Sequence, residues 1–335
     1  MIDKVIYFNK DIRNVTSLYY EVMLSALRKN NVELQEYQDL NFDSNGTKGK
    51  TTYVIVTQVM DCVRLYLRGY RNFIYWFQGI EPEEHFLMNQ SRLKFRINSW
   101  LEKFVLKVCE YKIGVSKYQF EHYNKKYSLH LSEDNYFVMP CFNTRLNEEG
   151  FTIRGKYEHN TFCYAGGMQA WQGVDYIFKM FSELETKYQE NLFLKIFTKD
   201  LEATKELLSQ YPIKNYTVQS VTPEELDKEM SKCKFGFILR EDNIINNVAT
   251  PTKLSAYLAN GVIPIYTSSI RSYKDLADKF SYLCCLDGID DIEPVERMIE
   301  RDCNADDILS EYKKIFATYY SVENYIEGMK EFFSK

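Results

Sequence analysis

Short continuous runs of apolar residues recur along the chain and alternate with segments of helical periodicity. Val5–Phe8, Tyr53–Val56 and Phe73–Phe77 are rich in β-branched and aromatic residues and are bounded by polar ones. Such runs are typical of strands that are buried on both faces. Residues 15–29 and 93–108 instead carry apolar side chains at helical spacing. This alternation predicts parallel sheets with helices on both faces.

The alternation occurs twice, once in each half of the chain. Further strands are predicted over 32–37, 111–116 and 136–139 in the first half and over 162–165, 192–198, 216–219, 234–239 and 262–266 in the second. Pro140 ends the first series, and a charged, glycine-containing connection follows over 143–158. We therefore expect an α/β fold of two doubly wound, Rossmann-like domains, 1–145 and 158–310, followed by a helical segment over 311–335. Ligands of such folds bind at the carboxyl ends of strands, so we expect the site in the cleft between the domains.

Composition and charge narrow the classes of protein that fit. The 335 residues are 45% hydrophobic, which is enough for sizeable cores. No apolar run reaches the roughly 18 residues of a membrane span, and the N-terminus lacks the features of a signal peptide, so we expect a cytoplasmic location. The net charge is −5, but basic residues outnumber acidic ones over 61–126. That excess indicates an anionic partner for the first domain and is too small for a nucleic-acid-binding domain.

The sequence contains no recognisable pattern for a metal site or a nucleophilic triad. Its eight cysteines are scattered, without a C-x-x-C pair or the Cys/His spacing of a zinc site. His122, His130 and His159 stand alone in polar segments. No convincing H-x-x-x-H, D-x-D or nucleophile-elbow pattern occurs. We therefore expect neither a metal nor a cofactor.

A strand in the second half runs directly into paired glycines at Tyr164-Ala-Gly-Gly167. Glycines at this position let backbone N–H groups approach a phosphate, and the next helix would add the positive end of its dipole. Gly166 and Gly167 are therefore candidates for binding an anionic group. The same pattern also occurs in ordinary tight turns, because glycine is common there.

A polar segment between a predicted strand and helix contains the strongest candidates for phosphate binding. Arg240 lies just past the strand, and Lys253 lies in the first turn of a helix that is expected to begin at Thr250-Pro251. A cation in a first turn opposes the helix dipole, which costs about a few tenths of a kcal/mol unless an anion is bound there. Together with the hydroxyls of Thr250 and Thr252, these cations could hold a diphosphate. The alternative is a capped helix with a solvated lysine.

In the first half, a glycine and a proline force a turn directly after the buried strand over 73–77. The polar side chains that this turn gathers at the end of the strand are Gln78, Glu81, Glu83, Glu84 and His85. Carboxylates and a histidine at such an edge would orient hydroxyl groups or act as a general base. The alternative is a polar loop that opens the next helix, since glutamates are favourable in a first helical turn.

Residues 91–107 form a basic amphipathic helix. Its basic residues, Arg92, Arg96, Lys103 and Lys107, fall within a narrow sector at helical spacing. A basic helix of this kind suits peripheral contact with anionic lipid or with a lipid-pyrophosphate. The same pattern is also typical of a core helix with a solvated charged face.

Most of the second half resembles the retaining GT-B glycosyltransferases of family 4, the "group 1" enzymes of bacterial surface polysaccharides. Gly166 to Gly173 has the length and place of the family's donor loop, G-R-L-x-x-x-K-G. Residues 249–264, ATPTKLSAYLANGVIP, resemble the family variant S-P-T-K-x-x-E-Y-L-A-x-G-x-P-V. Residues 218–235 resemble the strand and helix beside the nucleotide base. In the first half, only the W-x-Q-G-x-x-P-E-E stretch over 76–84 is similar to polysaccharide glycosyltransferases.

The resemblance implies transfer of a hexose-type sugar from a nucleotide-sugar donor to a glycan or lipid-linked glycan acceptor, without a metal, at the cytoplasmic face of the plasma membrane. Arg240 and Lys253 would stabilise the leaving diphosphate, and the final helix would pack back on the first domain. The implied donor-binding residues are Gly166, Gly167, Gln172, Thr198, Val221, Asn243, Thr250, Pro251 and Thr252. The implied acceptor-binding residues are Gln78, Gly79, Glu83 and Glu84. Retention would need no dedicated base, whereas Glu81 is the candidate base for an inverting reaction.

Four positions depart from the family pattern. Gly167 and Gln172 stand where the family has an arginine and a lysine. Val248 and Ala256 stand where it has two glutamates spaced eight apart, of which the second binds the ribose. Three functions therefore stay open: an active transferase, a non-catalytic GT-B subunit that binds glycan or a partner transferase, and a GT-B epimerase. The second half lacks the carboxylate and histidine set that an epimerase would need.

Overall fold

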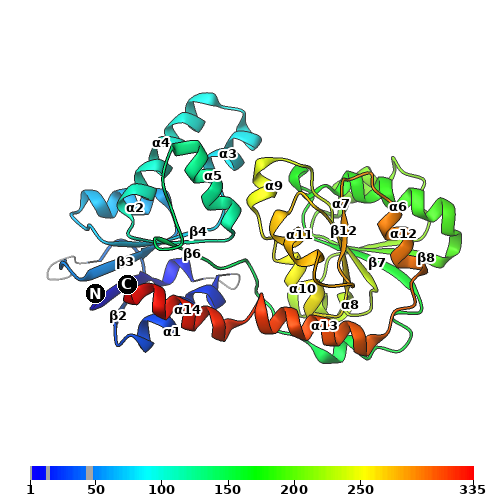
Figure 1. The fold of residues 1–335 in the computed structure, drawn as a ribbon. Coiled ribbons are helices and arrows are strands. Elements are labelled where there is room, and N and C mark those ends of the chain that lie inside the picture. The colour runs from blue at the N-terminus through cyan, green and yellow to red at the C-terminus, as the bar shows by residue number, and fades with distance from the viewer. Residues whose placement is uncertain (1, 13–15, 43–47) are drawn as a thin grey trace. The chain divides into compact units, whose positions relative to one another are not determined.

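The computed structural model describes residues 2–12, 16–42 and 48–335, which divide into two compact units (Figure 1). The first unit comprises Met1–Asn143 together with Ser321–Lys335, and the second comprises Thr144–Tyr320. Each unit is built on one six-stranded sheet in which every pairing is parallel. The predicted fold of two doubly wound α/β domains is therefore confirmed.

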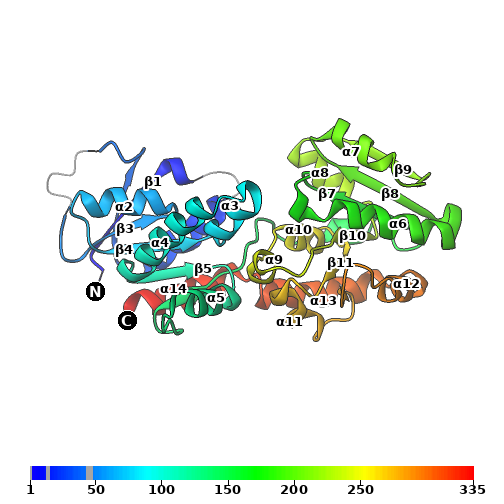
Figure 2. The same ribbon diagram turned by 90° about the horizontal axis from the view of Figure 1, so that it is seen from above.

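The sheet of the first unit has the order β2-β1-β3-β4-β5-β6. Its strands are β1 (Lys4–Phe8), β2 (Glu33–Tyr37), β3 (Thr52–Val56), β4 (Phe73–Phe77), β5 (Tyr111–Gly114) and β6 (Tyr136–Val138). Its helices are α1 (Ser17–Lys29), α2 (Val59–Leu67), α3 (Glu81–Asn89), α4 (Arg92–Val108), α5 (Lys117–Tyr127) and α14 (Val322–Ser334). Helices α1 and α14 lie side by side on one face of the sheet, and α2 and α4 cover the other face (Figures 1 and 2).

Burial of the central strands explains why the apolar runs form the core of this unit. All five residues of β4 are buried, as its unbroken sequence FIYWF predicts for a strand covered on both faces. The Trp76 ring lies 4.5 Å from the ring of Tyr19 on α1, measured between centroids. Helices α4 and α5 begin at serine caps, since Ser91 and Ser116 accept hydrogen bonds from backbone N–H groups in their first turns.

The sheet of the second unit has the order β12-β11-β10-β7-β8-β9. Its strands are β7 (Asn160–Ala165), β8 (Leu192–Phe197), β9 (Tyr216–Gln219), β10 (Phe235–Ile238), β11 (Ile263–Thr267) and β12 (Cys284–Leu286). Its helices are α6 (Val174–Tyr188), α7 (Leu201–Leu208), α8 (Pro223–Met230), α9 (Ile244–Val248), α10 (Lys253–Ala259), α11 (Arg271–Ala277), α12 (Glu293–Glu300) and α13 (Ala305–Thr318). Helix α8 begins with a capping box formed by Thr222 and Glu225.

The segment over 311–335 differs from the single helix expected there. Residues up to Thr318 belong to α13, which is part of the second unit, and only α14 belongs to the first. The Ser321 side chain accepts a hydrogen bond from the Asn324 N–H, and this cap starts α14 as a separate helix. Within the described part of the chain, no helix combines the length and the apolar character needed to cross a membrane.

Candidate active site

A buried arginine and a half-buried lysine meet at one amide oxygen at the carboxyl end of β10. Arg240 follows that strand by two residues, and Lys253 is the first residue of α10. Gln172 Oε1 accepts hydrogen bonds from Arg240 Nη2 at 2.8 Å and from Lys253 Nζ at 2.5 Å. The structure thus brings together three of the residues selected from the sequence, and we call them the Arg240–Lys253–Gln172 cluster.

The ammonium group of Lys253 is enclosed by the loop that follows β7. Its Nζ lies 4.5 Å from the centroid of the Tyr164 ring and 3.3 Å from the Tyr164 hydroxyl oxygen. On the side of Gly166, an added Cβ would lie 2.8 Å from Lys253 Cε and Nζ. The Tyr164 hydroxyl also donates a hydrogen bond to the Gly167 carbonyl at 2.6 Å. The missing side chain at Gly166 therefore makes room for the lysine.

Gly173 fixes the other end of the same loop against β10. Its φ is +66°, and an added Cβ would lie 2.4 Å from the Leu239 carbonyl oxygen. Because the backbone approaches so closely, Arg240 Nη1 reaches the Trp171 carbonyl and donates a hydrogen bond to it. Only glycine satisfies both the left-handed conformation and the contact.

The two basic side chains of the cluster have amide, carbonyl and hydroxyl oxygens as partners in place of carboxylates. Burial lowers the pKa of Arg240, which is 6% exposed. Burial, with the nearby charge of Arg240 as a second cause, holds the pKa of Lys253 well below its usual value. Among the described residues, no carboxylate forms an ion pair with either cation, and Arg240 Nε is buried without a hydrogen-bond partner. Such an arrangement is suited to a bound anion, which would supply the missing acceptor oxygens.

The segment before α10 contributes less to the cluster than its sequence predicts. Helix α10 has seven residues and starts only at Lys253, so the expected start at Thr250-Pro251 was wrong. Thr250 is buried, the Pro251 carbonyl accepts a hydrogen bond from the Tyr273 hydroxyl, and the Thr252 side chain makes no capping bond. The two threonines therefore stay candidates by position alone.

Three further donor-site candidates lie in other loops of the second unit. Thr198 Oγ1 accepts a hydrogen bond from the Asp200 N–H at 3.1 Å. The Asn243 side chain caps α9 by accepting from the Asn246 N–H at 3.0 Å. Val221 is half-buried in the connection between β9 and α8. In the described part of the chain, the side chains of Thr198 and Asn243 bond to nearby backbone groups and not to Arg240 or Lys253.

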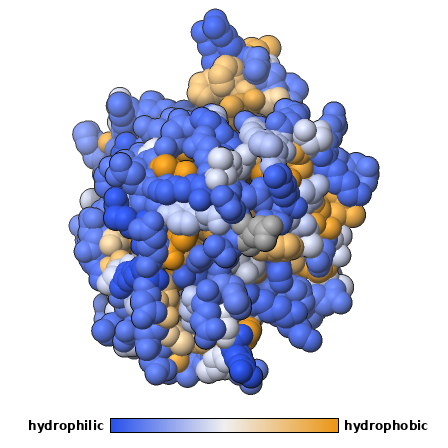
Figure 3. Space-filling view, turned by 90° about the vertical axis from the view of Figure 1, so that its right-hand side faces the viewer, coloured by the Kyte–Doolittle hydropathy of each residue, from blue (hydrophilic) through white to orange (hydrophobic). Residues whose placement is uncertain are grey.

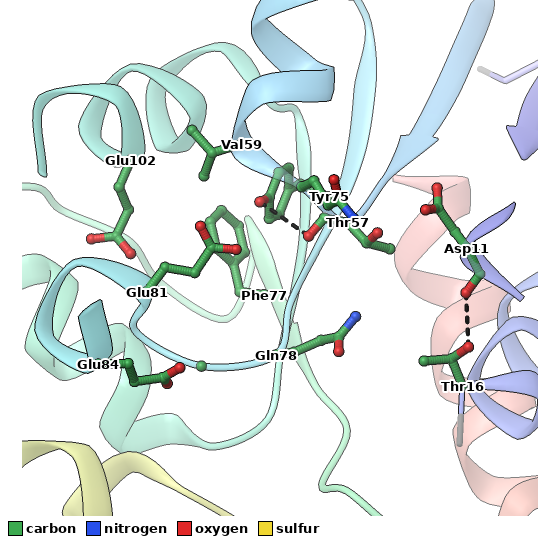
Figure 4. A pocket seen from close by; sticks show the side chains of 12 residues that line it. Asp11, Thr16, Thr57, Val59, Tyr75, Phe77, Gln78, Glu81, Glu84 and Glu102 are labelled. Carbon is green, nitrogen blue, oxygen red and sulfur yellow. Dashed lines mark hydrogen bonds between the residues drawn. The ribbon is translucent and has the colours of Figure 1, made fainter. Parts of the chain in front are cut away.

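A second site lies in the first unit, in a cavity of about 480 Å³ that includes the ends of β3 and β4. Its lining residues are Asp11, Thr16, Thr57, Gln58, Val59, Tyr75, Phe77, Gln78, Gly79, Glu81, Glu84 and Glu102. Figure 4 shows Glu81 from α3 and Glu102 from α4 on one side of the cavity and Asp11 on the other. Three of the five polar side chains that the turn gathers, Gln78, Glu81 and Glu84, therefore share this cavity, together with Gly79.

Glu83 does not line the cavity, although the sequence placed it with the others. Its carboxylate lies 2.9 Å from His122 Nε2 and 2.8 Å from Lys126 Nζ. Burial alone would raise its pKa, but the hydrogen bonds from His122 and Lys126 outweigh burial and lower it. The reason is helical geometry, since consecutive residues at the start of α3 point in different directions. Glu83 thus supports the fold of α5 on α3.

The pKa values of three glutamates that line the cavity, Glu81, Glu84 and Glu102, are raised. Burial raises the pKa of Glu81, and burial also raises the pKa of Glu84 despite a hydrogen bond from the Ile80 N–H at 3.1 Å. Burial raises the pKa of Glu102 to about 7. Glu102 also accepts hydrogen bonds from Tyr127 Oη at 2.5 Å and Lys126 Nζ at 3.2 Å. A carboxyl group poised near neutral pH is suited to proton transfer or to binding hydroxyl groups.

Sequence reasoning missed Glu102. The signal was its position, because Glu102 shares a helical face with Val105 and Leu106, three and four residues later, and all three are buried. An acidic residue within an apolar stripe needs partners inside the protein, and here Lys126 and Tyr127 supply them.

Replacing Glu102 with glutamine tests its raised pKa. The native state holds a proton on Glu102 up to about pH 7, whereas the unfolded chain releases it near 4.5. Between these values the native state binds more protons, so the contribution of Glu102 to stability falls as the pH rises. We expect the free energy of unfolding of Glu102→Gln, relative to the original chain, to increase by at most about 1.4 kcal/mol per pH unit over this window. Denaturant unfolding from pH 4.5 to 8 measures it, and a pH-independent difference would contradict the assignment.

Comparison with known proteins bears on the fold. No model of a known protein family matches the sequence, and no curated protein sequence matches it. Solved structures do match. One is HepE of Anabaena, in complex with UDP and glucose. The alignment covers 99% of this chain and 99% of HepE, with a TM-score of 0.67 and 8% sequence identity. WaaG, a glycosyltransferase involved in lipopolysaccharide biosynthesis, also matches. The alignment covers 99% of this chain and 99% of WaaG, with a TM-score of 0.59 and 11% sequence identity.

A third structure is S. aureus TarM in complex with UDP, fondaparinux and α-GlcNAc-glycerol. It aligns with 86% of this chain at a TM-score of 0.63 and 12% identity, and the chain spans 56% of TarM. The chain has the GT-B glycosyltransferase fold. In GT-B terms, the Arg240–Lys253–Gln172 cluster belongs to the second unit and the acidic cavity to the first. At these identities, the likeness establishes the fold alone.

Proposed function

We propose that the protein is a glycosyltransferase that moves a hexose-type sugar from a nucleotide-sugar donor, held by the second unit, to a glycan or lipid-linked glycan acceptor, held by the first. The observation that carries this proposal is the convergence of Arg240 and Lys253 on one acceptor atom. In the free protein, burial lowers the pKa of both side chains and so disfavours their charged forms, and a bound diphosphate would stabilise those charges. Gln172 Oε1 then occupies the place of a phosphate oxygen.

The cluster would act on the group that leaves. When the bond between the anomeric carbon and the diphosphate oxygen breaks, negative charge grows on that oxygen and the acceptor hydroxyl bonds to the carbon. Arg240 and Lys253 would stabilise this charge because little water screens them, Arg240 being buried and Lys253 half-buried. In a retaining reaction the hydroxyl proton would pass to the departing phosphate oxygen. Retention and independence from a metal are predictions from the family resemblance.

The acidic cavity would bind the acceptor. Glu81, Glu84 and Gln78 line it and supply oxygen and amide groups for sugar hydroxyls. Burial raises the pKa of Glu81, which makes it a stronger base than an exposed glutamate once it is ionised. Glu81 is therefore our candidate base if the reaction inverts configuration. We place this reaction in polysaccharide biosynthesis at the cytoplasmic face of a membrane, as the resemblance implies.

The principal alternative is a non-catalytic subunit with a degenerate donor site. One observation favours it: Val248 is buried and Ala256 half-buried, and neither side chain can hydrogen-bond a ribose where the family has glutamates. In that case the same fold would serve to bind glycan or a partner transferase.

An assay of nucleoside diphosphate release distinguishes these functions. The chain is incubated with each common nucleotide-sugar, with and without a mixture of oligosaccharide acceptors. We expect acceptor-dependent release from one donor, and a decrease in kcat/KM of about 10²–10³-fold in Arg240→Met, as for loss of one transition-state donor. Unchanged activity in this variant would reject the assigned phosphate site. Diphosphate binding without any release would favour the non-catalytic subunit.

A further inference from the structure

Helix α4 is apolar on its outward face. Leu93, Ile97 and Trp100 lie one turn apart on the helix, and their exposed fractions are 70%, 50% and 67%. At 100° per residue they fall within about 60° of one another. The apolar stripe of a surface helix usually faces the core. Helix α4 carries a second apolar stripe, which is exposed to solvent.

The inward face of the same helix is already occupied. Glu102, Val105 and Leu106 are buried against the rest of the unit, roughly opposite the exposed stripe. Rotating the helix to hide Leu93, Ile97 and Trp100 would expose Val105 and remove Glu102 from Lys126 and Tyr127. The exposed stripe thus does not reflect a poorly packed helix.

Neighbouring α3 continues the apolar surface. Phe86, Leu87 and Met88, near its end, are 37%, 47% and 53% exposed. Phe86 packs on Phe95 of α4 with ring centroids 5.3 Å apart, which joins the two helices. In the space-filling view, apolar surface appears at the top, where Figure 1 places α3 and α4 (Figure 3). We call these six residues, 86–88 with 93, 97 and 100, the α3–α4 patch.

The exposed charges on α4 have one sign, whereas the first turn of α3 carries the half-buried Glu81, Glu83 and Glu84. Over residues 85–108, the exposed Lys, Arg, Asp and Glu side chains are Arg92, Lys94, Arg96 and Lys107. The only acidic residue in this range is Glu102, which is buried. Arg96 lies on one flank of the apolar stripe and Lys94 on the other, at helical spacing. On α4, apolar side chains flanked by exposed cations are complementary to an anionic lipid surface, with acyl chains below and phosphates above.

We propose that the α3–α4 patch docks the first unit on an anionic bilayer. Leu93, Ile97 and Trp100 enter the interface between headgroups and acyl chains, and Arg92, Lys94 and Arg96 contact lipid phosphates. The sequence left 91–107 open between lipid contact and a core helix, and the exposed stripe favours the first. A second copy of the chain is a poorer occupant, because self-association through this patch would bring the same cations together. The proposal does not depend on donor binding, since its test measures partitioning alone.

Sedimentation with vesicles tests the proposal. The full chain is mixed with vesicles of phosphatidylglycerol and phosphatidylcholine in equal parts, or of phosphatidylcholine alone, at low and high salt. We expect the chain to sediment with the anionic vesicles, to bind the neutral ones at least about 10-fold more weakly, and to be released in part by salt. Replacement of Leu93, Ile97 and Trp100 by serine should reduce partitioning at least about 10-fold. Ile244→Ser, at an apolar residue of α9 that is 41% exposed, should leave it unchanged.

Other outcomes would overturn the proposal. They are a chain that stays in the supernatant with millimolar anionic lipid, or a triple-serine variant that folds normally by circular dichroism and still binds like the original. A dimer in solution that becomes a monomer in the triple-serine variant would instead assign the patch to a second copy. Arg92, Lys94 and Arg96 changed together to glutamine provide a second variant, which keeps the apolar stripe and should lose the preference for anionic lipid.

Discussion

Replacing Lys253 with methionine should weaken binding of the nucleotide-sugar donor by at least about 100-fold, as for loss of a charged hydrogen-bond donor to phosphate. The methionine fills a similar volume but removes the charge that now lies 2.5 Å from Gln172 Oε1. Arg240 alone would then face the diphosphate. The loss should be largest for diphosphate-containing ligands and small for the free nucleoside, since the proposed contact of the ammonium is with phosphate alone. Isothermal titration calorimetry of the folded variant measures both.

Lys234→Met is the matched control for this prediction. Lys234 also lies in the second unit, where it is buried immediately before β10, and donates a hydrogen bond to Asn160 Oδ1 at 3.1 Å. It lies at the opposite end of the strand from Arg240, so its loss should affect stability without changing the donor affinity. Equal weakening in both variants would show that removal of any such lysine disturbs the unit. The special role of Lys253 would then be rejected.

Replacing Gly173 with alanine should lower the free energy of unfolding of the second unit by about 2–4 kcal/mol. The left-handed φ of +66° costs an alanine about 1–2 kcal/mol. The contact of 2.4 Å between its Cβ and the Leu239 carbonyl adds a clash that only backbone movement relieves. That movement would also displace Trp171, to whose carbonyl Arg240 donates a hydrogen bond. Denaturant unfolding, together with donor titration, measures the two effects.

Gly288→Ala provides the comparison, because an added Cβ there meets no atom within 4 Å. It should change the stability by less than about 0.5 kcal/mol, as surface substitutions usually do. If Gly173→Ala were as stable as Gly288→Ala, the close approach of the donor loop to β10 would be refuted.

Most of the fold could be predicted from the sequence because its strands are buried on both faces. An unbroken run such as that of β4 has one plausible structure once helices flank it. The edge strand β12 was not predicted, because its sequence CCL contains none of the β-branched or aromatic residues that indicate a strand. The separation of α13 from α14 depends on the Ser321 cap, a feature of one residue.

The candidate site was predicted in part, for reasons that differ between residues. Arg240 could be predicted because it follows a strand, and Lys253 because it lies at the start of the next helix. Both positions are at the carboxyl edge of a parallel sheet, where the topology brings them close together. The convergence of both on Gln172 depends on side-chain conformations that no spacing encodes. Asn243 was assigned to the donor, yet its side chain caps α9, a use that Asn commonly has at a helix start.

The most direct test of the account is calorimetry of the unmodified chain with nucleosides, nucleoside monophosphates and nucleoside diphosphates. Each class is tested with uridine, guanosine, adenosine, cytidine and thymidine as the nucleoside. Because Arg240 and Lys253 converge where a phosphate oxygen fits, the account predicts that one diphosphate binds at least about 10-fold more tightly than its monophosphate, a difference of about 1.4 kcal/mol or more. Equal affinity for the nucleoside and its diphosphate, or no binding of any diphosphate at millimolar concentration, would contradict it.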